Sequence, residues 1–410
     1  MNRPCLLSRS FFLLLPAWIC GGAFVLSTAS ADWSHYRGPS ANGVSAEKIP
    51  ALSPDGPQPA WSAAVGTGTS SVTVSGDRVF TMGNLADKDI VWCLNAQTGA
   101  VIWKFEYPLS IDKRMFEGGT ASTPTVDGNR VYTVSHQGDL FCLDAATGHK
   151  VWYKHFQKEF GGRRPQWGYS GSPLVEGKLL IVDVGGKGTS TVAFDKATGS
   201  VVWKSGDDEP GYASPLVATI AGKRTVVVFK ASHLVGLDLK DGQELWRTEW
   251  KTSYNVNAAT PLISGDRILI SSAYGTGSGL YEVSAAGIKE RWRNKLLKSH
   301  VSTPVIADGH LFGLDGQADP KAALVCLDLA TGAEKWREPG IGGALVAAGG
   351  RLVVLTEKGE LIIAEASSSG FRPLSRTQVL GRRSWAQPTV ANGLIFCRNN
   401  DGNLVALKLN

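Results

Sequence analysis

Short runs in which hydrophobic and polar positions alternate recur along most of the chain, with glycine-containing turns between them. RVYTVS (130–135) and RILISS (267–272) are two such runs. Each is followed by a second short run, a turn of the Asp-x-x-Thr-Gly type or a variant of it, and a third run that carries a tryptophan. Alternation with a period of two over short stretches is typical of β-strands. The pattern predicts an all-β protein, and no helix is expected.

The runs belong to a sequence repeat. CLDAATGHKVW (142–152), AFDKATGSVVW (193–203) and CLDLATGAEKW (326–336) align without gaps. Successive tryptophans at this position are 43 to 51 residues apart. Four strands need about 40–45 residues, which is the length of one blade of a β-propeller. Each repeat is therefore expected to form one four-stranded antiparallel blade.

The two ends of the chain are expected to close the ring of blades. The last repeat (391–410) stops after its third strand, and PAWSAAV (59–65) carries Trp61 where the missing fourth strand would have its tryptophan. Closure by terminal pairing removes exposed strand edges. Counting the innermost strands predicts a single eight-bladed propeller over residues 57–410, after an N-terminal extension (32–56). A seven-bladed ring is the alternative, if the poorly matched seventh repeat is an insertion.

The residue types in each repeat have physical reasons. Proline near the start of an innermost strand suits an edge that faces the central channel, because proline cannot donate to a sheet ladder. Aspartate and glycine suit the tight turn, through a side-chain hydrogen bond and a positive φ. Tryptophan on the outermost strand can cover the seam between neighbouring blades. The tryptophans predicted in this docking role are Trp61, Trp103, Trp152, Trp203, Trp246, Trp292 and Trp336.

The first 31 of the 410 residues have the pattern of a secretory signal peptide. They hold two arginines and no acid, then an apolar run, and they end in Ala-Ser-Ala before Asp32. The alternatives are an uncleaved anchor and a lipoprotein attached at Cys20. However, Pro16 interrupts the apolar run, and Ile19 stands where a lipid-attachment motif has a small residue. The mature protein is expected to be exported, either periplasmic or secreted, and not to span the membrane.

Four cysteines follow the predicted leader: Cys93, Cys142, Cys326 and Cys397. The first three occupy the same place in different repeats, which is too far apart for a disulfide. We interpret them as small buried apolar residues. The chain has no CxxC pair and no cluster of histidine and cysteine, so no metal site is expected.

The repeated pattern DxxTGxxxW resembles the tryptophan-docking motif of the quinoprotein superfamily, whose propellers are named after pyrroloquinoline quinone (PQQ). Good copies span most of the mature chain. The segment DWSHYRGPSANGVS (32–45) is also similar to the opening of many exported members that are not dehydrogenases. The resemblance implies an eight-bladed PQQ-like propeller.

Two kinds of protein share this resemblance. Quinoprotein dehydrogenases hold PQQ and Ca²⁺ on the axis and generally carry two adjacent cysteines, which this chain lacks. Bare propellers, such as the propeller lipoprotein of the outer-membrane β-barrel assembly machinery, scaffold partner proteins. We expect a non-catalytic, cofactor-free binding or scaffold protein for a protein partner or an envelope component. The alternative is a PQQ- and Ca²⁺-dependent oxidoreductase acting on alcohols or sugars.

The loops that lead into the innermost strands, called leading loops below, should gather around one mouth of the channel. They hold 17 Lys and Arg residues against 9 Asp and Glu residues. This excess predicts a basic rim that could attract an acidic partner surface or a small anionic ligand on the axis, whereas the mild net charge of +6 does not indicate nucleic-acid binding. Solvated loop charge is the alternative. The rim candidates are Arg114, Arg163, Arg164, Arg382 and Arg383.

Aromatic and polar residues just before the innermost strands are the candidates for lining the channel mouth. The alternative is that they pack the mouth shut. His300 is the best single candidate for proton transfer, but the sequence identifies no catalytic residue, and we do not expect Asp112 or Glu117 to be catalytic. The lining candidates are Trp167, Tyr169, Tyr212, Asn257, His300 and Trp385.

Overall fold

The computed structural model describes Met1 and residues 32–51, 56–112, 114, 116–316 and 322–409. The predicted leader (1–31) lies outside these residues apart from Met1. Ala31–Asn410 forms one compact unit. Among the described residues, no helix is long and apolar enough to cross a membrane.

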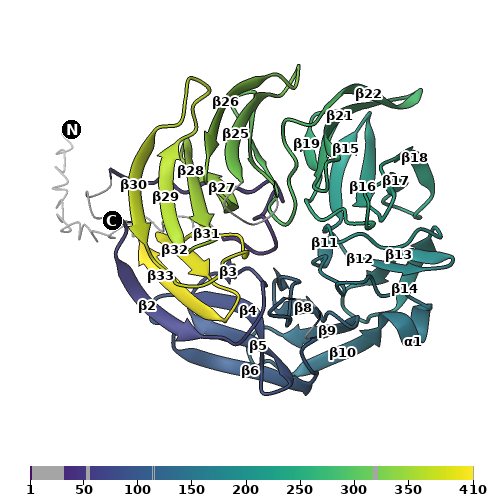
Figure 1. Ribbon diagram of the computed structural model, residues 1–410. Helices are drawn as coiled ribbons and strands as arrows, with labels where there is room; N and C mark the ends of the chain where they lie inside the picture. The colour runs from purple at the N-terminus through teal and green to yellow at the C-terminus, as the bar shows by residue number, and fades with distance from the viewer. Residues whose placement is uncertain (2–31, 52–55, 113, 115, 317–321, 410) are drawn as a thin grey trace. The chain divides into compact units, whose positions relative to one another are not determined.

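Eight antiparallel four-stranded blades follow one another around a central channel (Figure 1). This confirms the predicted eight-bladed propeller, and the seven-bladed alternative is wrong. We number the blades in chain order. They are blade 1 (β3 Thr73–Ser75, β4 Arg78–Leu85, β5 Lys88–Asn95, β6 Val101–Pro108), blade 2 (β7 Thr125–Asp127, β8 Arg130–Val134, β9 Asp139–Asp144, β10 Lys150–His155), blade 3 (β11 Leu174–Glu176, β12 Leu179–Gly186, β13 Thr189–Asp195, β14 Val201–Ser205), blade 4 (β15 Leu216–Ile220, β16 Lys223–Phe229, β17 His233–Asp238, β18 Glu244–Glu249), blade 5 (β19 Leu262–Ser264, β20 Arg267–Ser272, β21 Gly277–Ser284, β22 Gly287–Asn294), blade 6 (β23 Val305–Ala307, β24 His310–Asp315, β25 Ala323–Asp328, β26 Glu334–Pro339), blade 7 (β27 Gly343–Ala348, β28 Arg351–Thr356, β29 Glu360–Glu365, β30 Pro373–Gln378) and blade 8 (β31 Thr389–Ala391, β32 Leu394–Arg398, β33 Asn403–Lys408, with β2 Pro59–Ala64).

The two ends of the propeller sequence pair in blade 8. Strand β2 lies antiparallel to β33, with Trp61 opposite Ala406 and Ser62 opposite Val405. The N-terminal strand therefore completes the last blade, as the sequence predicts.

Two elements were not expected. Strand β1 (Val44–Ser45) pairs in parallel with the innermost strand β27 and adds a fifth strand to blade 7. A five-residue helix, α1 (Phe156–Phe160), lies in the leading loop of blade 3 and ends at Gly161, whose φ of 61° is left-handed. The prediction that the chain has no helix is therefore wrong at this one turn.

Each docking tryptophan sits at a seam between neighbouring blades. The indole N–H of Trp103 donates to the carbonyl of Ala145 in blade 2 at 3.0 Å. Its ring lies against Gly148, where a Cβ would come within 2.6 Å of the indole. Asp144 holds the same turn, because its Oδ1 accepts from the backbone N–H groups of Ala146 and Thr147. The other indole donors at these seams are Trp61 to Ala96, Trp152 to Lys196, Trp203 to Leu239, Trp292 to Leu329 and Trp336 to Ser367.

A ring of hydrogen bonds ties the innermost strands together at the throat of the channel. In most blades the residue before the strand-opening proline carries a hydroxyl, which accepts from the backbone N–H of the equivalent residue in the preceding blade. Among the described residues, six links are present, and they stop at blade 7, where Ala344 has no hydroxyl. The links run Ser71 to Thr123 (3.0 Å), Thr123 to Ser172 (2.9 Å), Ser172 to Ser214 (2.9 Å), Ser214 to Thr260 (3.4 Å), Thr260 to Thr303 (2.9 Å) and Gln387 to Ser71 (3.0 Å).

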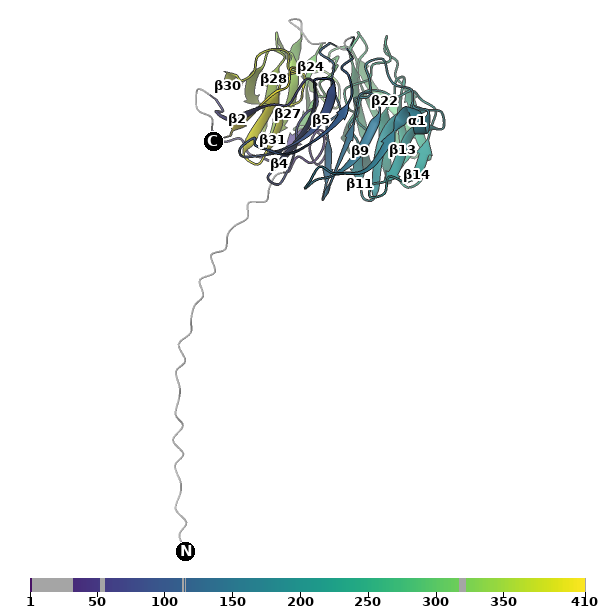
Figure 2. The ribbon, with the colours of Figure 1, turned by 90° about the horizontal axis from the view of Figure 1, so that it is seen from below.

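The N-terminal segment 32–49 lies across the other end of the innermost strands (Figure 2). Trp33 exchanges two 2.9 Å backbone hydrogen bonds with Val74 of β3. Arg37, only 1% exposed, donates to the carbonyls of Thr303 and Pro304 at 3.1 and 2.6 Å. Arg37 thus contacts blade 6 and β1 pairs with blade 7. The N-terminal segment therefore joins the two blades between which the hydroxyl ring is interrupted.

Candidate functional site

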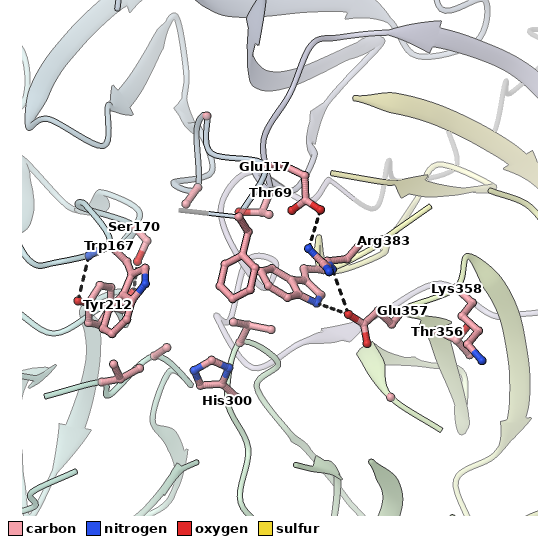
Figure 3. Close-up of a pocket in the computed structure, with 18 of the residues that line it drawn as sticks. Thr69, Glu117, Trp167, Ser170, Tyr212, His300, Thr356, Glu357, Lys358 and Arg383 are labelled. Atoms are coloured by element: carbon pink, nitrogen blue, oxygen red, sulfur yellow. Dashed lines mark hydrogen bonds and ion pairs between the residues drawn. The ribbon is translucent and has the colours of Figure 1, made fainter. Parts of the chain in front are cut away.

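A cavity of about 1110 Å³ occupies the channel mouth on the face of the leading loops (Figure 3). One residue of each blade forms its inner wall. In six blades this is the third residue before the strand-opening proline; in blades 1 and 7, Val72 and Leu345 stand in the place of that proline. These residues are Thr69, Ala121, Ser170, Tyr212, Ala258, Val301, Gly342 and Trp385. Six of the eight are small or aliphatic, so the two large aromatic rings dominate the wall.

The predicted lining candidates divide into four that line the cavity and two that do not. Trp167, Tyr212, His300 and Trp385 line the cavity. Tyr169 does not, because it is buried against Phe156 and donates its hydroxyl to the carbonyl of Val184.

Asn257 is also buried away from the cavity. Its amide donates to the carbonyls of Lys230, Ala231 and Trp250, and its oxygen accepts from Ser272. Tyr169 and Asn257 stand four residues before their prolines. At that position in blades 3 and 5, the side chain enters the blade instead of the channel.

The predicted basic rim is largely neutralised by nearby carboxylates. Of its five arginines, only Arg383 lines the cavity. The other four each have a carboxylate within 4 Å. These ion pairs are Arg114–Asp112 (2.8 Å), Arg163–Glu209 (3.2 Å), Arg164–Asp112 (3.0 Å) and Arg382–Asp401 (3.9 Å). Asp112 accepts from two arginines, which hold its pKa well below the usual range.

Arg383 is the centre of a network on one wall of the cavity. Its Nη1 donates to Glu117 at 2.6 Å, and its Nε lies 3.3 Å from Glu357. The guanidinium carbon is 5.4 Å from the ring centroid of Phe116 and 5.0 Å from that of Trp385, so aromatic faces contact the cation. Five side chains thus hold one another in place.

Aromatic rings form the opposite wall. The ring centroid of Trp167 lies 6.1 Å from that of Tyr212 and 6.4 Å from that of Tyr254. The ring centroids of Tyr254 and Tyr274 are 5.1 Å apart. Tyr274 meets the ring of His300 edge-on at 5.3 Å. Burial lowers the pKa of His300 to about 4, so its imidazole is neutral at pH 7. Figure 3 shows Trp167 and Tyr212 on one side and Arg383 with its carboxylates on the other.

Sequence reasoning did not assign several residues of the site. Phe116, Glu117 and Tyr254 lie on leading loops, where no spacing distinguishes them from other loop residues. Glu357 and Lys358 come from the turn between β28 and β29. Such second-to-third strand turns lie at the same end of a blade as the leading loops, and this rule of topology could have identified them.

The lining does not fit PQQ. The quinone is planar and carries three carboxylates, so its site needs several cations. Among the described residues, the cavity offers two cations, Lys358 and Arg383, and Arg383 is already engaged by Glu117 and Glu357. Glu360, a third carboxylate in the lining, pairs with Arg376. Among the described residues, no group of three or more His, Cys, Asp or Glu side chains could hold a metal ion.

The blade count, the docking tryptophans and the channel-mouth cavity define a propeller of the PQQ-like class. Residues 87–338, more than half of the chain, match the model of the PQQ-like family described as outer membrane protein assembly factor BamB. The chain belongs to this family.

One relative by sequence is the outer membrane protein assembly factor BamB of Alkalilimnicola ehrlichii. It is 29% identical over 217 residues, which cover 48% of this chain and 51% of the relative. The aligned part of the chain thus spans about half the length of that protein.

Solved structures support the fold alone. BamB from Moraxella catarrhalis superposes with a TM-score of 0.65 at 17% identity, covering 86% of this chain and 99% of that structure. A quinohemoprotein alcohol dehydrogenase from Comamonas testosteroni gives a TM-score of 0.68 at 14% identity, covering 92% and 80%. BamB and a quinohemoprotein alcohol dehydrogenase therefore share this architecture.

Proposed function

We propose that this protein is an exported, non-catalytic binding protein of the cell envelope, and that its partner docks on the face of the leading loops. The observation that carries the proposal is the channel-mouth cavity with two exposed aromatic side chains: Phe116, 63% exposed, lines it, and Tyr254, 58% exposed, packs against the lining residues Trp167 and Tyr274. Exposed aromatic groups beside a concave site are typical of binding surfaces.

The family supports this role. Its described member is an outer membrane assembly factor, which implies a protein partner or another envelope component for this chain. The pattern of residues 1–31 supports export. Because the rim arginines are paired, we expect aromatic contact to contribute more to partner affinity than attraction of an acidic surface.

Affinity capture from an envelope extract tests the proposal, followed by binding of the captured component to purified protein. The variant combines Phe116→Ala with Tyr254→Ala. The matched control combines Val101→Ala with Val201→Ala, two exposed apolar residues on the outermost strands β6 and β14. We expect a stoichiometric complex with wild type and control that the variant weakens at least about tenfold. Equal affinity for all three proteins would refute docking on this face.

A further inference from the structure

We propose that the channel-mouth cavity binds an oligosaccharide built of pyranose rings. This inference rests on the proposed binding function and names the ligand class for the same site. Three features support it: aromatic rings on opposite walls, a set of prearranged donors and acceptors, and a throat that leaves few backbone groups for a peptide.

The eightfold register places two aromatic rings on opposite sides of the channel. Tyr212 belongs to blade 4 and Trp385 to blade 8, which are diametrically opposed in an eight-membered ring. The inner-wall residues of the blades between them are small or aliphatic. Phe116 extends one aromatic surface, at 4.9 Å from Trp385, and Trp167 extends the other. The C–H face of a pyranose is apolar and packs on aromatic faces, so the cavity offers two stacking surfaces.

Sugar hydroxyl groups donate and accept hydrogen bonds, and the lining supplies both. Glu117 and Glu357 present carboxylate oxygens that Arg383 holds in place. Within the described part of the chain, Arg383 Nη2 has no hydrogen-bond partner and can donate to a ligand. The neutral ring of His300, for which no described residue supplies a hydrogen bond, can donate from one nitrogen and accept at the other. Because the positive charge of Arg383 is offset by the carboxylates of Glu117 and Glu357, the network suits uncharged hydroxyl groups better than a free anion.

The throat below the cavity disfavours an extended peptide. A peptide that adds to a sheet edge needs backbone N–H groups, and the hydroxyl ring already uses this group in six blades, for example at Thr123 and Thr260.

The lining of the cavity also extends outward over one blade, which favours several sugar rings over one. Beyond the inner wall it reaches Lys358 in the β28–β29 turn and Gln378 at the end of the outermost strand β30. Neighbouring strands lie about 4.8 Å apart, so a blade of four strands is roughly 14 Å across. The lining thus runs outward over blade 7, where the leading loop is reduced to Gly340–Gly342.

Isothermal titration of the full mature protein tests the proposal with five hexasaccharides: maltohexaose, cellohexaose, xylohexaose, chitohexaose and hexagalacturonate. The first four are uncharged, and the last separates neutral from acidic recognition. The variants are Trp167→Ala and Arg383→Ala. The controls are Tyr153→Ala on strand β10 and Arg224→Ala, which removes an exposed arginine paired with Glu176. Thermal melting of every variant checks that it is folded.

We expect at least one uncharged hexasaccharide to bind, with both cavity variants losing about tenfold or more in affinity and both controls staying within about twofold. The proposal is overturned if no hexasaccharide binds at millimolar concentration, if only hexagalacturonate binds, or if folded cavity variants bind as tightly as wild type. It is equally overturned if the captured envelope component is a protein whose peptide segment occupies the cavity. Failure of saccharide binding alone, with capture through Phe116 and Tyr254 intact, leaves the proposed function standing.

Discussion

Trp61 lies opposite Ala406 across strands β2 and β33, although 345 residues separate them in the sequence. The same tryptophan donates its indole N–H to the carbonyl of Ala96 at 2.8 Å and packs against Phe396. One side chain therefore contacts both blade 8, which it completes, and blade 1, against which that blade closes. The position of every leading loop around the cavity depends on this closure.

Trp61→Ala should cost about 3–5 kcal/mol of unfolding free energy, because it removes a large buried ring and leaves a carbonyl unpaired. Guanidinium denaturation measures the loss. Trp167→Ala, which truncates a partly exposed ring at the cavity, serves as the control and should cost much less. A loss below about 1 kcal/mol for Trp61→Ala would mean that terminal pairing does not hold the ring closed.

Arg37→Ala should cost about 2–4 kcal/mol, since a buried guanidinium that bonds the carbonyls of Thr303 and Pro304 is lost. The effect should be local to blades 6 and 7. Hydrogen exchange followed by mass spectrometry should find faster exchange in β23 and β27 and unchanged exchange in β11. Uniformly faster exchange in all blades would contradict the assignment of Arg37 as a local tie.

His136 should make the protein less stable in acid. Burial, with Arg164 nearby, lowers its pKa to about 4, and neither buried ring nitrogen has a hydrogen-bond partner among the described residues. In the unfolded chain this histidine has a pKa near 6.5 and takes up a proton below that pH, whereas in the folded chain it stays neutral down to about pH 4. The folded state therefore loses stability as pH falls from about 6.5 to about 4.

The variant His136→Leu should reduce this pH dependence of the unfolding free energy. His149→Gln, on an exposed turn, is the matched control. An unaltered pH profile for His136→Leu would show that this histidine is not responsible. His35 and His300, whose pKa values burial also lowers to about 4, should account for much of the remaining dependence.

The four cysteines of the propeller should be unreactive in the folded protein. All four are buried and free, and burial raises the thiol pKa of Cys93, Cys142 and Cys326 to about 12. Protein lacking residues 1–31 should show no reactive thiol with Ellman's reagent until denatured, and then four. Fewer than four thiols after denaturation without reductant would indicate a disulfide.

Most of the fold could be predicted because its determinants are local and repeated. The alternating strands, the turn aspartate and the tryptophan recur within each blade, and Trp61 supplies the missing member of the set. The contacts that were missed join distant segments. Arg37 bonds a carbonyl 266 residues away, and the two-residue strand β1 has no periodicity that sequence could reveal.

The candidate site was predictable only in part. Topology was enough to predict which face of the propeller holds the site. Five of the predicted candidates line the cavity: Trp167, Tyr212, His300, Arg383 and Trp385. Side-chain direction depends on the local backbone of each loop, because Tyr169 and Asn257 enter the blade four residues before their prolines, whereas His300 at the same position lines the cavity. The pairing of rim arginines with loop carboxylates requires three-dimensional proximity, which loop composition does not contain.

The central claim is that ligands and partners meet the protein at the leading-loop face. Photo-crosslinking in the native cells tests it directly, with a photoreactive phenylalanine analogue in place of Phe116 or Tyr254 and, as the control, in place of Gln97 on the opposite face. The account predicts light-dependent adducts from the first two positions and none from the third. Adducts from the Gln97 position alone, or equal adducts from all three, would contradict it.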